Sequence, residues 1–563
     1  MNWAEPPMTR DQLVLFPSSL DEVIPEEHLV RDLDAILRSL DWAALEAKYH
    51  GALGARPVHP RVLTSIILYG HLTRVRSSRQ LEAALWCRVD FRWLVQGEQL
   101  DHSTISIFRK QFADLLLGIN TQFGVLAYQM GVTSLTQFGF DGTRLRASNA
   151  RSKKVLVAEL DELEQKLQQT FAEWEKQVAE ADALDEEQLG GASLLGDSQK
   201  LTKQQQLAKK SKQTKNRLQA VRDAQAEIAR VKAADEPVPE RIPLTDPESR
   251  ISPNKEGGFA PNYTPLAAVD MESGLILDGD VIQNTDEEQH LVAAVEGIES
   301  RFAAAGLQQH VESLAADRKF VTGPNLETLA ERQTTFYGPI AAQPEFVKRA
   351  DGRTPIPPEQ WPELPIVVVR KGKQGQPDQV QLAKEAFLYD AAENCYWCPQ
   401  GQPLSHIGQT SETTRGTERR VIRQRYRSAA PVCETCPLRD KCLRAQGTQR
   451  TLSHDQFETH RHALRQRLTA ESSSDQLTRR QSEGERPFAV VKQQMGIRQF
   501  LLRGHENVKK EWRWMTSSAN LQVMIRWWRA NRDRLPNLLA NFVAFLKSTH
   551  PKGARISPAE VGA

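Results

Sequence analysis

Five cysteines in the last third of the chain have the spacing of metal ligands. They form two Cys-x-x-Cys pairs, Cys395 with Cys398 and Cys433 with Cys436, and Cys442 follows. Two thiolates separated by two residues can grip one Zn²⁺, and a second such pair completes a tetrahedron. We therefore predict a structural zinc site made by four of the five cysteines, with either Cys395 or Cys442 spare. An iron–sulfur site and unmetallated thiols are the alternatives.

Acidic residues at the ends of strand-like segments suggest a second kind of metal chemistry. Asp141 lies on a segment that reads as a strand, and Asp317 ends the strand-like segment that begins at Val311. Two such acids, together with a glutamate on a later helix, can hold two divalent cations for in-line phosphoryl transfer. The acids are far apart along the chain, so no local sequence pattern supports their grouping in one metal site. An ordinary turn at Asp141 and a helix cap at Asp317 therefore remain as alternatives.

The overall composition is that of a globular protein. The chain has 563 residues, of which 40% are hydrophobic and 26% are charged, and this excludes collagen-like, fully disordered and disulfide-scaffold proteins. It contains no apolar run of about 18 residues, so we expect no membrane span. Residues 1–16 lack the apolar core of a signal peptide. With only six cysteines, five of them clustered, we predict a cytoplasmic protein.

The net charge of +2 hides a segregation of charge along the chain. Residues 161–190 hold ten acidic side chains against two lysines, whereas residues 441–563 hold 22 Lys and Arg against 10 Asp and Glu, a net charge of 22 − 10 = +12. A basic C-terminal region is typical of proteins that bind a polyanionic partner such as nucleic acid. A merely solvated basic surface is the alternative.

Hydrophobic periodicity divides the chain into helical and mixed regions. Residues 1–130 read as short helices with tight turns, which fits a helix-turn-helix-like DNA-binding bundle or any other small helical bundle. Apolar residues spaced three and four apart over 155–187, and again over 218–231, predict a coiled-coil hairpin. Residues 263–282 predict two strands joined by a turn, and strands and helices then alternate up to residue 337, which is an α/β order.

Several short motifs make the chain recognisable. The stretches FDGTRLRASN at 140–149, ADRKF at 316–320 and RQSEGERPFAVVK at 480–492 resemble those of bacterial insertion-sequence transposases of the DDE type. Residues 500–504 and 518–521 share the resemblance, and residues 59–109 resemble the InsH-type N-terminal domain of the same proteins. The motifs are short, but they occur in the family's order over nearly the whole chain.

The resemblance implies an α/β fold with an RNase H-like catalytic core. The core would occupy residues 131–342 and be completed by a helical part in residues 466–563. A helical DNA-binding domain would precede it in residues 1–130. The coiled-coil segment 151–235 and a Cys-rich, zinc-ribbon-like segment, 343–465, would be insertions.

The resemblance also implies the active-site residues. Asp141, Asp317 and Glu485 would bind two Mg²⁺ or Mn²⁺ ions, and Arg480 and Lys492 would hold phosphates near them. Glu485 is preferred to Glu483 because Lys492 then stands seven residues further on and would share its helix face.

The implied activity is DNA transposition. The enzyme would hydrolyse a phosphodiester at each end of an insertion sequence, and the freed 3′-hydroxyl would then attack target DNA. Double-stranded DNA, as terminal repeats and as target, would be the partner, and holding two ends together implies a homodimer. A catalytically inactive relative that acts as a DNA-binding or regulatory protein is the alternative, and a nuclease without strand transfer is a third possibility.

Overall fold

The computed structural model describes most of the chain. The described residues are 19–49, 58–149, 154–189, 198–254, 257–284, 286–341, 343–348, 352–370, 379–413, 420–444, 447–469, 471–537, 542 and 544. The prediction made for residues 1–16 lies outside them. Among the described helices, none combines the length and apolar character that crossing a membrane requires.

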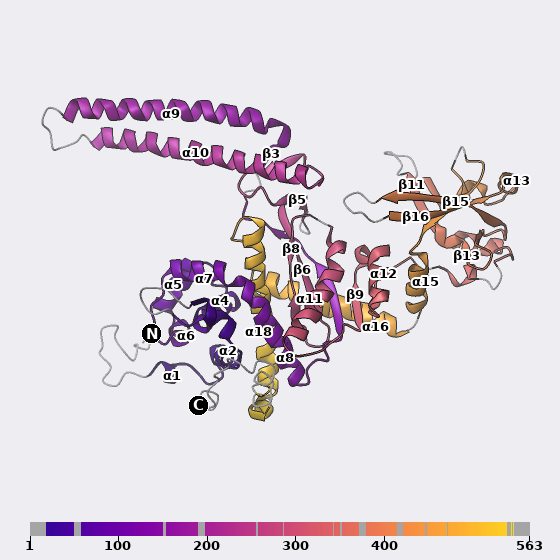
Figure 1. Ribbon diagram of the computed structural model, residues 1–563, viewed down its shortest axis with the longest axis horizontal. Coiled ribbons are helices and arrows are strands. Elements are labelled where there is room, and N and C mark those ends of the chain that lie inside the picture. The colour runs from indigo at the N-terminus through magenta and orange to yellow at the C-terminus, as the bar shows by residue number, and fades with distance from the viewer. Residues whose placement is uncertain are drawn as a thin grey trace, which may run out of the picture.

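A mixed sheet forms the centre of the molecule (Figure 1). Its main path is β10-β9-β1-β6, in which β1, β9 and β10 are parallel and β6 is antiparallel to β1. The long strand β6 also pairs with β2, β5, β7 and β8. Strand β6 is buried along nearly all of its length, including the polar residues Asn262, Thr264 and Asp270. The bounds are β1 Gln137–Gly142, β2 Leu145–Arg146, β5 Arg250–Pro253, β6 Phe259–Asp270, β7 Ile276–Asp278, β8 Val281–Ile282, β9 Ser313–Ala316 and β10 Thr335–Tyr337.

The N-terminal helices pack onto this sheet through one long C-terminal helix, α18 (His505–Ala530). Helix α18 contacts α2, α4 and α8, and its Trp512 and Trp514 are completely buried. One hydrophobic cluster includes Val30 of α2, Phe138 of β1 and Trp514, so the helices and the sheet share a core. The helices before the sheet are α1 Leu20–Val23, α2 Leu29–Arg38, α3 Ala43–Glu46, α4 Pro60–Leu72, α5 Ser78–Cys87, α6 Val89–Leu94, α7 His102–Gln111 and α8 Leu116–Gln129.

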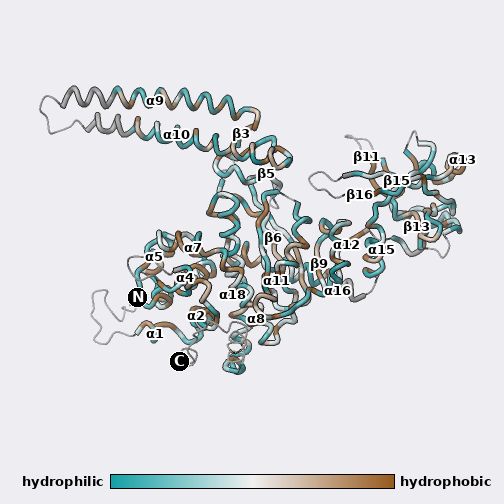
Figure 2. The backbone as a smooth tube through the Cα atoms, viewed as in Figure 1, coloured by the Kyte–Doolittle hydropathy of each residue, from teal (hydrophilic) through white to brown (hydrophobic). Residues whose placement is uncertain are grey.

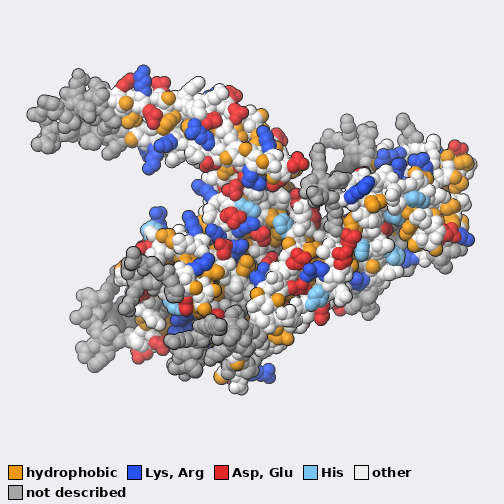
Figure 3. Space-filling view, in the orientation of Figure 1, with side chains coloured by type: hydrophobic (Ala, Val, Ile, Leu, Met, Phe, Trp, Pro, Cys, Tyr) orange, Lys and Arg blue, Asp and Glu red, His pale blue; other side chains and the backbone are white. Residues whose placement is uncertain are grey.

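Two long helices project from the sheet as a hairpin (Figure 1). Helices α9 (Leu160–Leu189) and α10 (Ser198–Ala233) are joined at their base by the strand pair β3 (Lys154–Leu156) and β4 (Arg241–Pro243). They are antiparallel, and part of the predicted apolar stripes forms a small buried cluster between them, with Leu160, Leu167, Leu218, Val221, Ala224 and Ile228 as its buried helical members. Figure 2 shows that the rest of the hairpin is mostly hydrophilic, and Figure 3 shows charged side chains of both signs over it.

The Cys-rich segment folds as a separate five-stranded antiparallel sheet in the order β13-β14-β15-β16-β17, here called the insertion sheet. Its core is a distinct cluster that includes Tyr396, Leu404 and Tyr426. Helix α15 then packs on α12 and returns the chain to the central sheet. The bounds are α11 Leu291–Ala304, α12 Gly323–Glu331, β11 Ile366–Arg370, β12 Gln379–Leu382, β13 Leu388–Asp390, β14 Cys395–Trp397, β15 Pro403–Thr413, β16 Arg420–Ser428, α13 Ala430–Glu434, α14 Arg439–Cys442, β17 Thr451–Asp455, α15 Glu458–Arg467, α16 Glu471–Arg479 and α17 Arg486–Ala489.

Candidate active site

Strand pairing brings two of the predicted acids together. Strands β1 and β9 are parallel neighbours, and Phe140 of β1 lies opposite Ala316 of β9. The next residues along the two strands are Asp141 and Asp317, so both acids stand at the same edge of the sheet. The Asp317 carboxylate also accepts a hydrogen bond from the Lys319 amide at 2.7 Å. Asp317 therefore ends a strand and caps the short helical turn that follows, so the two interpretations of this residue are compatible.

The third predicted acid, Glu485, is linked to Asp141 by the side chain of Arg480, which lies between them. Glu485 lies between a π-helical turn, Arg480–Gly484, and α17, and its side chain is 50% exposed. The Arg480 side chain is only 9% exposed; its Nη1 is 3.7 Å from Asp141 Oδ2 and its Nη2 is 3.8 Å from Glu485 Oε1. By contrast, the alternative Glu483 forms an ion pair with Arg486 at 3.1 Å. The structure thus directs Glu485, and not Glu483, towards Asp141.

The electrostatics of Asp141 reflect these neighbours. The pKa of Asp141 is raised to about 6, mainly by burial and to a smaller extent by the nearby charges of Asp317 and Glu485. The amide of Gly142 and the Arg480 guanidinium act in the opposite direction. Three acids therefore share one site with a single buried arginine to offset them. Such carboxylates suit hard divalent cations, whose charge would compensate the remaining repulsion.

Lys492 lies beside the same site. Its Nζ donates a hydrogen bond to the hydroxyl of Thr143, two residues after Asp141. Between Glu485 and Lys492 the chain forms α17 and the start of the π-helical turn Val490–Gln494, so the seven-residue spacing is not that of a regular α-helix. The helix face that the two residues would share stays a prediction.

One acid near the site has no counterpart among the predicted residues. The carboxylate of Glu287 lies so close to Gly142 that a Cβ atom on this glycine would overlap it. Glu287 is buried and forms an ion pair with Lys319 at 3.1 Å. Its sequence neighbourhood, residues 285–288, reads only as the start of a helix. No local signal distinguishes Glu287, because its proximity to Gly142 depends on how α11 packs.

The structure separates the five late cysteines into two groups. The charges of neighbouring thiols contribute to the raised pKa values of Cys398, Cys436 and Cys442, which places these three and Cys433 in one neighbourhood, although no three of the four sulfurs lie within 4.8 Å of one another. Burial is the main cause in each case, and the pKa of Cys442 rises to about 12. These four cysteines are half-buried, and thiols that disfavour one another's ionisation are a donor set whose charge a Zn²⁺ ion would compensate.

Cys395 stands apart from these four. Its sulfur and the carboxylates of Asp390 and Glu393 form the one trio of possible ligand atoms in the described residues that lie within 4.8 Å of one another. Asp390 already accepts hydrogen bonds from the amides of Ala392 and Glu393, and Glu393 forms an ion pair with Arg353. We therefore treat Cys395 as the spare cysteine.

Two family models match this chain. Residues 18–111 match the model described as "Transposase domain (DUF772)", and residues 397–525 match the one described as "Transposase DDE domain". Together, the two matches indicate an insertion-sequence transposase of the DDE type. No curated protein and no solved structure gives a match.

Only part of the candidate site lies within the residues that the two family models match. The DDE-domain match contains Cys398, Arg480, Glu485 and Lys492, whereas Asp141 and Asp317 lie outside both matches. A transposase implies DNA as partner and the use of divalent metal. The assignment of individual acids rests on the geometry of the site.

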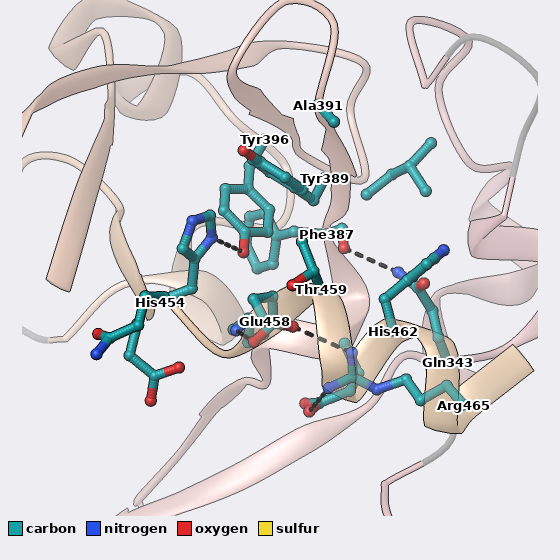
Figure 4. A pocket seen from close by; sticks show the side chains of 15 residues that line it. Gln343, Phe387, Tyr389, Ala391, Tyr396, His454, Glu458, Thr459, His462 and Arg465 are labelled. Carbon is teal, nitrogen blue, oxygen red and sulfur yellow. Dashed lines mark hydrogen bonds and ion pairs between the residues drawn. The ribbon is translucent and has the colours of Figure 1, made fainter. Parts of the chain in front are cut away.

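The transposase also contains an aromatic cavity of about 300 Å³ between the insertion sheet and α15 (Figure 4). Its polar side chains already satisfy one another. The Tyr396 hydroxyl and His454 Nδ1 are 2.8 Å apart, and Glu458 binds Lys384 at 2.7 Å and Arg465 at 3.1 Å. We interpret this network as a set of structural contacts that hold α15 against the insertion sheet.

The raised pKa of Asp141 predicts a stability effect in the metal-free protein. Because the folded value of about 6 exceeds the ordinary 3.8, ionisation costs stability as the pH rises through this interval, and the cost persists above it. Asp141→Asn should therefore stabilise the protein in EDTA at pH 8, by at most about 3 kcal/mol, and should have little effect at pH 4. Thermal unfolding of the two proteins at both pH values tests this, and equal stabilisation at both would contradict it.

Proposed function

We propose that this chain catalyses transposition by hydrolysing a phosphodiester at each end of an insertion sequence and joining the freed ends to target DNA. The observation that carries the proposal is the convergence of Asp141 and Asp317 at the ends of parallel strands, with Glu485 linked to Asp141 through Arg480. When bound there, two Mg²⁺ or Mn²⁺ ions would polarise phosphoryl oxygens and stabilise the attacking and leaving oxygens.

The sheet supports an RNase H-like core. Strands β1, β6 and β7 form an antiparallel meander, and β9 and β10 add to the other side of β1 in parallel. Asp141 lies on the first of these core strands and Asp317 follows the fourth, in the positions that the resemblance implies. On this proposal the α9/α10 hairpin and the insertion sheet are additions to the core, and the hairpin is a coiled coil.

Both steps would use the same chemistry at one site. In the first, a water oxygen bonds to phosphorus, the bond to the 3′ oxygen breaks, and a 3′-hydroxyl is released. In the second, this hydroxyl loses its proton and attacks a target phosphate, from which a DNA oxygen leaves. Asp141, Asp317 and Glu485 would hold the cations, and Arg480 and Lys492 would position phosphate oxygens. No covalent enzyme intermediate is required.

The other domains would bind DNA and stabilise the fold. The N-terminal helices would recognise the terminal repeats, and a homodimer would hold the two ends together. In the Cys-rich segment the donor set Cys398, Cys433, Cys436 and Cys442 would hold a structural Zn²⁺.

The test is cleavage of a supercoiled plasmid that carries the DNA flanking this coding sequence. With Mg²⁺, the wild type should nick at the ends and yield joined products, whereas Asp141→Asn should bind the ends without nicking them. Asp223→Asn, on the exposed surface of α10, is the matched control and should behave as wild type. Nicking without joined products would indicate a nuclease. End binding without nicking by the wild type would indicate an inactive relative.

A further inference from the structure

The buried side chain of Glu287 contacts the chain just after each of the two predicted strand-end acids, Asp141 and Asp317. Glu287 opens the turn that leads into α11, and its side chain is only 11% exposed. Its Oε1 is 3.1 Å from Lys319 Nζ, and its other carboxylate oxygen lies against Gly142. One carboxylate therefore connects the end of β1 with the turn that follows β9.

The two residues that Glu287 contacts are also the ones whose amides hold the acids. The Gly142 amide donates a hydrogen bond to Asp141 Oδ1 at 2.8 Å. The Lys319 amide donates a hydrogen bond to Asp317 Oδ1 at 2.7 Å. A shift of either contact residue would therefore turn the carboxylate that its amide holds.

The contact with Gly142 is a close fit. A Cβ atom at this position would overlap the carboxylate of Glu287. Gly142 is the last residue of β1 and pairs with Leu266 of β6 in the antiparallel ladder, so the strand cannot simply move aside. The carboxylate is thus seated on the backbone of the central sheet.

The turn that begins α11 and the turn that follows β9 are tied together by Asn325 of α12. The buried side-chain amide of Asn325 donates to the carbonyl of Glu288 at 2.9 Å and to that of Phe320 at 3.2 Å. Phe320 also packs edge-on against Phe140 of β1, with ring centroids 5.2 Å apart. Both turns are therefore held at the sheet edge where the acids lie.

We propose that Glu287 is a positioning residue that sets the spacing of Asp141 and Asp317 for the binding of divalent cations. It acts through Gly142 and Lys319, whose amides orient the two carboxylates. Groups that orient metal ligands contribute about 10- to 100-fold to metal affinity or activity. Because the ammonium group of Lys319 lies at its Oε1 and would repel a cation there, Glu287 is placed to orient ligands and not to be one. This inference rests on the proposed function, because it takes the acids as the cation site.

The first experiment measures Mn²⁺ binding to the full-length protein without DNA, from the electron paramagnetic resonance signal of the free ion. Glu287→Gln keeps the size of the side chain but removes its charge, and should lower the Mn²⁺ affinity about tenfold. Lys319→Met should lower the affinity as well, although the loss of a positive charge would by itself raise it. Glu296→Gln, which breaks an exposed ion pair of α11, is the control and should leave the affinity unchanged.

The double variant, Glu287→Gln with Lys319→Met, separates positioning from direct ligation. If the two residues act through one contact, the double variant should bind Mn²⁺ within about twofold of the weaker single variant. Weaker binding by Glu287→Gln together with stronger binding by Lys319→Met would make Glu287 a direct ligand and overturn the proposal. Unchanged binding by both single variants would also overturn it. Lys319→Arg, which keeps the charge and the donor, should retain most of the affinity, which a general loss of structure in this turn would not allow.

The cation dependence of plasmid nicking gives a second readout. In single-turnover assays, Glu287→Gln should raise the Mg²⁺ concentration for the half-maximal rate about tenfold. The rate at saturating Mg²⁺ should fall by less than about threefold, because the ligands themselves are still present. An unchanged Mg²⁺ requirement would contradict the positioning role.

The positioning role and the proposed function can fail separately. If the wild type binds Mn²⁺ and the variants lose affinity as expected, but no nicking occurs, the proposed function fails and the positioning role stands. If the wild type nicks and the variants bind Mn²⁺ normally, only the positioning role fails. A wild type that binds no Mn²⁺ would overturn the positioning role, since the acids would then form no cation site by themselves.

Discussion

Replacing Glu485 with glutamine is expected to abolish cleavage while leaving DNA binding intact. A glutamine keeps the shape of the side chain but removes the negative charge that a divalent cation needs. Losing one of three carboxylate ligands should cost about 4 kcal/mol of transition-state stabilisation, which is about a thousandfold in rate. The measurement is the single-turnover rate of end nicking with saturating protein.

Glu483→Gln is the matched control for this prediction. Glu483 is two residues away and is paired with Arg486, so its replacement should change the nicking rate by less than about threefold. The two variants therefore separate the alternatives that the sequence left open. A large loss in Glu483→Gln with a normal Glu485→Gln would reverse the assignment of the third acid.

Replacing Cys436 with alanine is expected to remove zinc from the protein and to unfold the Cys-rich segment. Four thiolates supply the free energy of a structural zinc site, and a site with three is far weaker. Zinc content after dialysis against a weak chelator should fall from about one ion per chain to about none. Limited proteolysis should then cut within residues 343–465, which the wild type protects.

Cys395→Ala tests the separation of the cysteines in the same assay. Cys395 is paired in space with Asp390 and Glu393 and not with the four clustered thiols. It should therefore retain about one zinc ion per chain, although the loss of a buried side chain lowers stability somewhat. Equal loss of zinc from both variants would place Cys395 in the metal site.

The local elements were predictable because their signals are local. Strand character around Asp141 and Asp317, and the three-and-four spacing in α9 and α10, follow from periodicity within a few turns of the chain. The metal-binding chemistry of the cysteines follows from residue type and spacing. Residue type and spacing limit the candidate zinc ligands to five cysteines, but they do not show which four of the five bind the metal.

The irregular part of the site could not be predicted in the same way. A seven-residue spacing from Glu485 to Lys492 defines a common face only if the helix is regular, and the π-helical turn Val490–Gln494 within this interval removes that regularity. The position of Glu287 against Gly142 likewise depends on the packing of the turn Glu287–His290 that leads into α11.

By itself, then, the sequence determined the element types and the set of five thiols, because residue chemistry and hydrophobic period act over short distances. The three candidate acids came from the resemblance to DDE transposases. Tertiary structure alone decided that β1 lies beside β9, that Arg480 stands between Asp141 and Glu485, and that Cys395 leaves the thiol cluster. These choices join residues far apart in the chain. They are set by the free energy of burying whole strands and helices in a common core, which no short segment encodes.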